Sequence, residues 1–129
     1  MGGYIGPSPV AGNKLGNIEV DTAVASTFVN TNATGNVTLD FSENQNFILT
    51  LTGNVTLANP TTEQVGQTGF IVLIQDATGG RTLSLDADYE TAGAAGVTLS
   101  TTANTTDVVP YIVIATNRIL LGSVLLAFA

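Results

Sequence analysis

The chain has 129 residues, of which 44% are hydrophobic and only 10% are charged, with ten acidic side chains against three basic ones. The net charge of −7 argues against nucleic acid and anionic membranes as partners, because both interactions need a basic patch. Since the sequence has no histidine and no cysteine, it excludes Ser-His-Asp and Cys-His catalysis and disulfides.

The first 17 residues predict an extended N-terminal arm. Glycine and proline recur through this segment and allow no regular element. Tyr4, Ile5 and Val10 are apolar positions on it. A disordered tail and an arm that orders on a neighbouring subunit both fit the pattern. We therefore divide the chain into an arm, residues 1–17, and a β domain, residues 18–129, that begins with short strands at 18–21 and 26–29.

A six-residue repeat organises the centre of the chain. Residues 34–39 and 52–57 both read Thr-Gly-Asn-Val-Thr-Leu. Gly and Asn tolerate positive φ, so each Thr-Gly-Asn predicts a turn, and each Val-Thr-Leu predicts the start of a strand. Phe47, Leu49 and Leu51 then alternate with polar or smaller residues, which predicts a further strand with one buried face.

Three more strands are predicted in the C-terminal half. Residues 68–75 are apolar on both faces, residues 108–115 carry Pro110, and residues 119–128 end the chain. Residues 76–81 contain Gly79-Gly80 and predict a hairpin turn. No apolar stripe of helical period occurs, so the sequence predicts an all-β fold, an antiparallel β-sandwich or jelly roll with an extended N-terminal arm.

The strands that are apolar on both faces predict a homo-oligomer. A lone sandwich buries one face of each strand, so the second face needs cover from a neighbouring copy. The residues that we expect at this interface lie in the arm and in the strands at 68–75 and 119–128: Tyr4, Ile5, Val10, Ile71, Leu73, Leu120, Leu121 and Leu126.

Asp86, Asp88 and Glu90 are the candidate metal ligands. On a strand they would share a face and could gather calcium, which takes six to eight oxygens. The alternative, which we favour, is a solvated outer face. Paired carboxylates such as Asp40 and Glu43 could in principle act as acid and base, but neither a nucleophile–base pair nor a phosphate loop is present. We expect no enzymatic activity, no metal and no cofactor.

The repeat and the segments after it resemble a β module of tailed-bacteriophage virion proteins. The similarity runs through residues 34–57, 75–83 and 99–108, and residues 4–9 are similar to the opening of many phage tail fibres. This module often ends a longer fibre in the family. Because it fills most of this chain, we expect a small free-standing virion component.

The resemblance implies a structural virion protein, and we interpret it as a capsid decoration (cement) protein. It would be a trimer on the capsid surface, assembled in the host cytoplasm, with itself and the major capsid protein as partners. The alternative is a tail-fibre or tail-spike module that recognises host-surface glycans.

Overall fold

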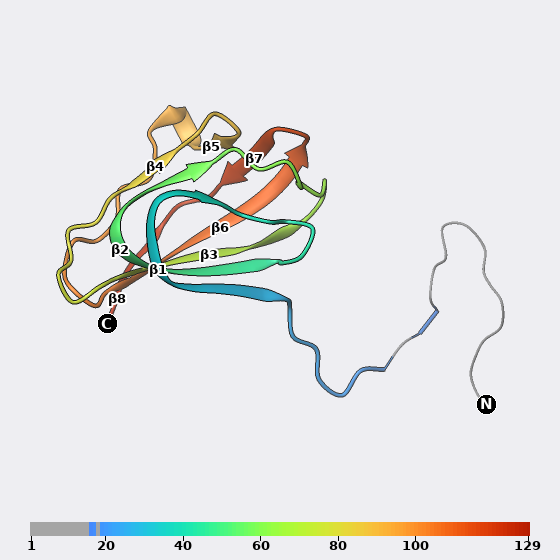
Figure 1. Ribbon diagram of the computed structural model, residues 1–129. Helices are drawn as coiled ribbons and strands as arrows, with labels where there is room; N and C mark the ends of the chain where they lie inside the picture. The colour runs from blue at the N-terminus through green and yellow to red at the C-terminus, as the bar shows by residue number, and fades with distance from the viewer. Residues whose placement is uncertain (1–15, 18) are drawn as a thin grey trace.

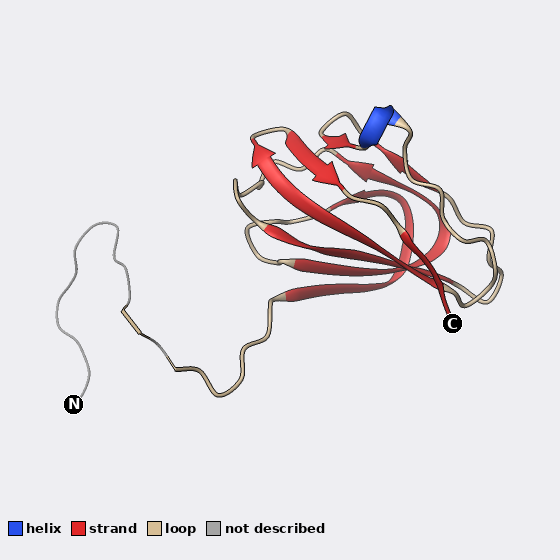
Figure 2. Ribbon diagram, turned by 180° about the vertical axis from the view of Figure 1, so that it is seen from behind, coloured by secondary structure: helices blue, strands red, loops and turns tan. Residues whose placement is uncertain are grey.

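Eight strands and one 3-10 turn form the computed structural model, which describes residues 16, 17 and 19–129 (Figures 1 and 2). The elements are β1 (Thr27–Thr38), β2 (Asn46–Ala58), β3 (Thr68–Gln75), β4 (Leu83–Leu85), β5 (Tyr89–Glu90), η1 (Ala92–Ala94), β6 (Thr106–Ala115), β7 (Arg118–Leu121) and β8 (Leu125–Phe128). The predicted all-β class is confirmed. No helix in the described ranges is long and apolar enough to cross a membrane.

The strands form a single mixed sheet in the order β1-β2-β3-β6-β7-β5, with β4 on β2 and β8 on β6. Four pairings are parallel: β1 with β2, β2 with β3, β2 with β4, and β5 with β7. The pairings of β6 with β3, β7 and β8 are antiparallel. The prediction of an antiparallel sheet is therefore wrong, and the structure does not confirm a sandwich or jelly roll.

The sheet curls because β2 changes partner half-way along. Residues 47–51 pair with β3, whereas residues 55–57 pair with β4. The curl is visible where β1 and β2 double back together (Figure 1). The hairpin predicted at residues 76–81 is therefore absent. This segment connects β3 to β4, and each of these strands pairs with β2 in parallel rather than with the other.

The two copies of the repeat lie at this bend, in the C-terminal parts of β1 and β2. The second half of one repeat pairs with the other, Asn36 with Thr56 and Val37 with Leu57. Gly35 has a φ of +67°, which a residue with a side chain rarely adopts. The predicted turns at Thr-Gly-Asn are thus bends and register shifts within paired strands.

The core fills the inside of the curl with the inward residues of each strand. Phe47, Leu49 and Leu51 of β2 are fully buried, as their alternation predicted. Phe41, from the loop between β1 and β2, packs edge-on against Phe47 and Tyr111 at centroid distances of 5.0 and 5.3 Å. This loop crosses back over the core and lets two parallel strands be joined by only seven residues.

The chain before β1 is extended and exposed. Residues 19–26 form no strand, although residues 18–21 were predicted to begin one. Most of the predicted arm, including Tyr4, Ile5 and Val10, lies outside the described residues. The boundary at residue 17 stays a prediction.

Candidate functional site

The outer face of the sheet carries an apolar row that crosses five strands. Val29, Ile48, Val72, Val108 and Leu125 are register neighbours from β1 through β2, β3 and β6 to β8. The two ends of the row, Val29 and Leu125, are 58% and 53% exposed, and the three central residues are half-buried. The row is therefore a continuous apolar strip across the sheet rather than a set of isolated side chains.

More large apolar side chains flank this row. Phe70 of β3 and Ile112 and Ile114 of β6 point to the same side of the sheet as this row, and they are 49%, 40% and 38% exposed. A shallow groove of about 310 Å³ lies among them, lined by Thr27, Asn46, Ile48, Phe70, Val72 and Val108. We call the surface formed by this groove and the apolar row the outer apolar face.

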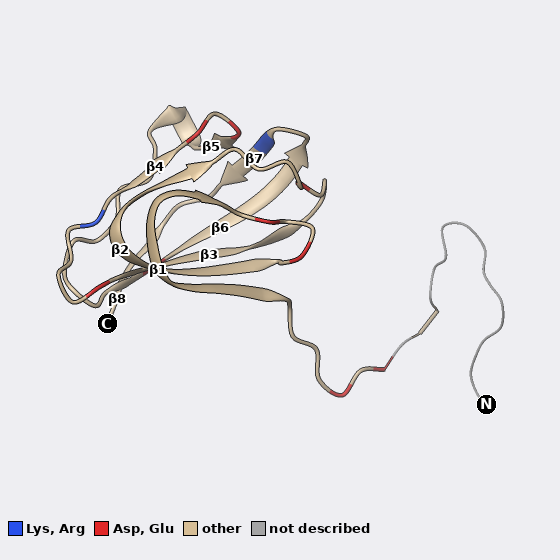
Figure 3. Cartoon of the chain, viewed as in Figure 1, with Lys and Arg blue, Asp and Glu red and all other residues tan. Residues whose placement is uncertain are grey.

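The outer apolar face carries no charged side chain. Among β1, β2, β3, β6 and β8, the one charged residue is Asp107, which points inward and is 2% exposed. Its carboxylate accepts hydrogen bonds from the backbone N–H groups of Ser100 at 2.6 Å and Ala127 at 2.8 Å. The charges lie in loops, the N-terminal segment and β-strand ends (Figure 3). An exposed apolar patch without charge is typical of a protein–protein contact.

The predicted interface residues are divided between the core and the surface. Ile71, Leu73 and Leu121 are 1%, 2% and 7% exposed, because their parity directs them into the core. In the single chain they therefore expose little side-chain surface to a neighbouring copy. Leu126 is 54% exposed and Leu120 is half-buried.

The sequence analysis missed Phe70 and Val72, which alternate with Ile71 and Leu73. Their strand is apolar on both faces, so its pattern alone does not reveal which set points outward.

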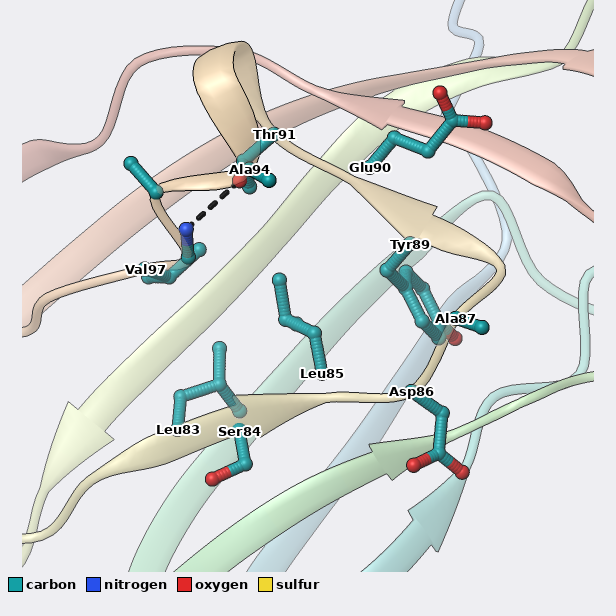
Figure 4. Close-up of a pocket in the computed structure, with 12 residues that line it drawn as sticks. Leu83, Ser84, Leu85, Asp86, Ala87, Tyr89, Glu90, Thr91, Ala94 and Val97 are labelled. Carbon is teal, nitrogen blue, oxygen red and sulfur yellow. Dashed lines mark hydrogen bonds between the residues drawn. The ribbon is translucent and has the colours of Figure 1, made fainter.

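A second surface feature is a groove of about 750 Å³ between β4 and the segment from β5 to Val97 (Figure 4). Leu83 and Leu85 project into it from β4, and Val97 lies on the opposite side. Its wall is held by the Thr91 hydroxyl, which accepts a hydrogen bond from the Gly96 backbone N–H at 2.8 Å (Figure 4). We call this hollow the β4 groove.

Hydroxyls and carboxylates surround the apolar floor of the β4 groove. Ser84, Asp86, Glu90 and Thr91 line it together with the leucines. Glu90 is bound to Arg118 through two hydrogen bonds of 2.6 and 3.0 Å, which lower the pKa of Glu90. Asp86 is exposed and accepts one long hydrogen bond, from Asn59 N–H at 3.3 Å. Such a surface can hold a ligand that has both hydroxyl groups and a carbon face.

The predicted metal ligands do not converge. Glu90 is occupied by Arg118, Asp86 faces solvent, and Asp88 is 9% exposed. Burial raises the pKa of Asp88, and the nearby carboxylates of Glu63 and Asp86 raise it further. The described ranges contain no group of three His, Cys, Asp or Glu side chains placed to hold a metal ion. The three carboxylates that the sequence offered as ligands are therefore not gathered at one point.

Comparison with known proteins gives one family. The family model described as "Putative phage tail fibre C-terminal domain" matches residues 20–115, and the chain belongs to that family. No curated protein matches the chain, and no solved structure does. The resemblance to a phage virion module, drawn from the repeats, is confirmed. The chain is a structural phage protein of the virion, and the family name points to the tail rather than to the capsid surface.

Proposed function

We propose that this chain is a tail-fibre module that attaches the virion to its host by binding a surface glycan, without catalysis and without a cofactor. The observation that carries this proposal is the family match, which spans residues 20–115 and therefore most of the β domain. The match supports the tail-fibre alternative of the sequence analysis better than capsid decoration. The two surfaces described above supply the parts that such a module needs.

The outer apolar face is the proposed assembly surface. A row of five apolar residues without a charge would be a liability on a free monomer, and a second copy of the same chain is the simplest cover. Identical subunits normally close into symmetric rings. We propose a homotrimer, on the basis of the resemblance to fibre proteins, with neither nucleic acid nor membrane as a partner.

The β4 groove is the proposed ligand surface. A sugar ring has an apolar C–H face that can pack on Leu83 and Leu85 and hydroxyls that can donate to the Asp86 carboxylate. Asp86 is suited to this role because it is exposed and holds only one long hydrogen bond.

Adsorption to host cells tests the proposal. The purified domain should bind host cells and compete with the phage for adsorption, and Asp86→Ala should weaken both effects at least about tenfold. The matched control is Glu43→Ala, which removes an exposed carboxylate from the loop between β1 and β2 and should change neither. Absence of binding by an assembled, folded domain, at concentrations that saturate the cells, would contradict the attachment role.

Capsid decoration is the second candidate, because the outer apolar face could equally cover a capsomer junction. Counting the chain in purified virions separates the two locations. A few copies per particle are expected for a tail fibre, and hundreds would favour the head.

A further inference from the structure

The extended segment before β1 has the sequence pattern of a strand but has no strand partner. In residues 19–26, Val20, Thr22 and Val24 alternate with Asp21 and Ala23. β-branched residues at every second position are typical of strands. Yet the whole segment is exposed, with Val24 at 88% and Val20 at 59%. The pattern therefore predicts a pairing that the single chain does not supply.

The sheet also ends with an unpaired strand. β1 is the terminal strand, pairs with β2 along one side, and has no described strand on its other side. Its first residues are apolar on both faces and incompletely covered, Phe28 at 39% and Val29 at 58% exposure. Phe28 is in register with the fully buried Phe47, so it belongs to the core face and is exposed because the sheet stops there. One further strand would cover both residues.

The C-terminal end of this segment, next to β1, is held by hydrogen bonds so that the segment points away from its own sheet. The Ser26 carbonyl accepts hydrogen bonds from the backbone N–H groups of Gln45 at 2.8 Å and Asn46 at 3.0 Å. The Ser26 hydroxyl donates to the Glu43 carbonyl at 2.7 Å, and Thr27 Oγ1 donates to the Ala25 carbonyl at 3.0 Å. The chain leaves the body beyond β1 in both views (Figures 1 and 2).

We propose that residues 20–26 of one copy add as a strand to the free edge of β1, along residues 27–30, of a neighbouring copy. Main-chain hydrogen bonds would supply the attachment, as in other cases of strand addition. Val20, Thr22 and Val24 would extend one face of the acceptor sheet, and the alanines the other. Each copy donates one segment and accepts one, so every edge is filled in any closed ring.

The family match also begins at residue 20, so it includes this segment, which touches little in the single chain. A segment that belongs to the domain but finds its contacts on a second copy accounts for both facts. The inference rests on the assembly part of the proposed function.

Proline substitution tests the strand pairing. In a strand, alternate N–H groups point to opposite sides, and proline removes the donor. The double variants Thr22→Pro/Val24→Pro and Ala23→Pro/Ala25→Pro therefore remove N–H donors from opposite edges of the added strand. One of them should raise the subunit dissociation constant at least about tenfold, and the other should leave it within about threefold. Equal effects of the two variants would overturn the proposal.

Cross-linking identifies which chain supplies the strand beside β1. Because the sequence has no cysteine, only the introduced cysteines can react. A tagged Val24→Cys chain is mixed with an untagged Val29→Cys chain and treated with a short bis-maleimide. The hetero-cross-linked product should exceed that from Val24→Cys with Val65→Cys, an exposed valine elsewhere, at least about tenfold. Cross-linking confined to a single chain carrying Val24→Cys and Val29→Cys would show instead that the segment folds onto its own sheet.

The two proposals can fail separately. A wild-type chain that is monomeric at micromolar concentration contradicts the assembly, and the strand exchange with it. An oligomer whose assembly is indifferent to both proline pairs contradicts the exchange alone and leaves the attachment role to the adsorption experiment.

Discussion

The Tyr111 hydroxyl donates a hydrogen bond of 2.6 Å to the backbone carbonyl of Gln45, joining β6 to the loop before β2. The same hydroxyl accepts a hydrogen bond from Gln67 Nε2 at 3.0 Å. The Tyr111 side chain is buried, so Tyr111→Phe would remove both hydrogen bonds from a largely buried position. We expect a loss of about 1–2 kcal/mol in the free energy of unfolding, measured by urea titration.

Tyr89→Phe is the matched control for Tyr111→Phe. The Tyr89 hydroxyl is buried and has no hydrogen-bond partner, and burial raises the pKa of Tyr89. Removing an unsatisfied buried hydroxyl costs no hydrogen bond, so we expect the stability to stay the same or rise by up to about 1 kcal/mol. A loss as large as that of Tyr111→Phe would show that hydrogen bonding does not account for the difference.

Gly53 of β2 lies against Thr34 of β1 at the bend. A Cβ at this position would collide with the Thr34 side chain. We expect Gly53→Ala to lower the free energy of unfolding by about 1–3 kcal/mol, as overpacking does elsewhere. Gly16→Ala is the control, because Gly16 has open space around it and should tolerate the methyl group without change. A double variant in which Thr34→Ala accompanies Gly53→Ala should recover part of the loss, because it removes the Thr34 Oγ1 atom that the new Cβ would meet.

The sequence predicted the strands better than their pairing. Alternation placed Phe47, Leu49 and Leu51 on the core face, where the structure has them. The repeats, however, predicted turns, and Gly35 does take positive φ. Strand precedes each repeat and continues through its Thr-Gly-Asn, and the two repeats pair with each other, so Thr-Gly-Asn bends the strand instead of ending it. Such pairing between distant segments has no local signal.

The sequence predicted that an apolar surface would exist, but not which residues form it. The apolar character of residues 70–74 led us to predict that a second face is covered by a neighbouring copy. Which of Ile71 and Val72 points outward is fixed by the packing of the core and not by the sequence of the strand itself. The β4 groove was not predictable, because it is formed by β4 and residues 91–97, which no sequence pattern pairs.

Protonation of Asp40 and protonation of Asp88 should change the stability of the fold in opposite directions. The Ser42 side chain lowers the pKa of Asp40, so this carboxylate stabilises the fold at neutral pH and its contribution is lost as pH falls below about 3.8. Burial raises the pKa of Asp88, so its charge disfavours the fold at neutral pH and the penalty is relieved on acidification.

Asparagine substitutions separate these two signs. At pH 7 we expect Asp88→Asn to raise the melting temperature and Asp40→Asn to lower it, and both differences from the wild type should shrink near pH 3. Thermal unfolding followed by circular dichroism at several pH values gives the comparison. Parallel shifts of the two variants at pH 7 would contradict the opposite environments of these carboxylates.

Val72 is the most informative position for assembly, because it lies at the centre of the outer apolar face between Ile48 and Val108. A carboxylate there stays hydrated in a monomer but would be buried without a partner in an oligomer, which costs several kcal/mol. We expect Val72→Asp to shift the oligomer to monomer in light scattering while the circular dichroism spectrum keeps its strand signal. Ile71→Asp, one residue away, should instead unfold the chain, since Ile71 is 1% exposed in the core. Val65→Asp supplies the surface control: this valine is 67% exposed in a loop, so its substitution should leave both fold and assembly unchanged. Assembly that survives Val72→Asp would exclude the outer apolar face as the contact between copies.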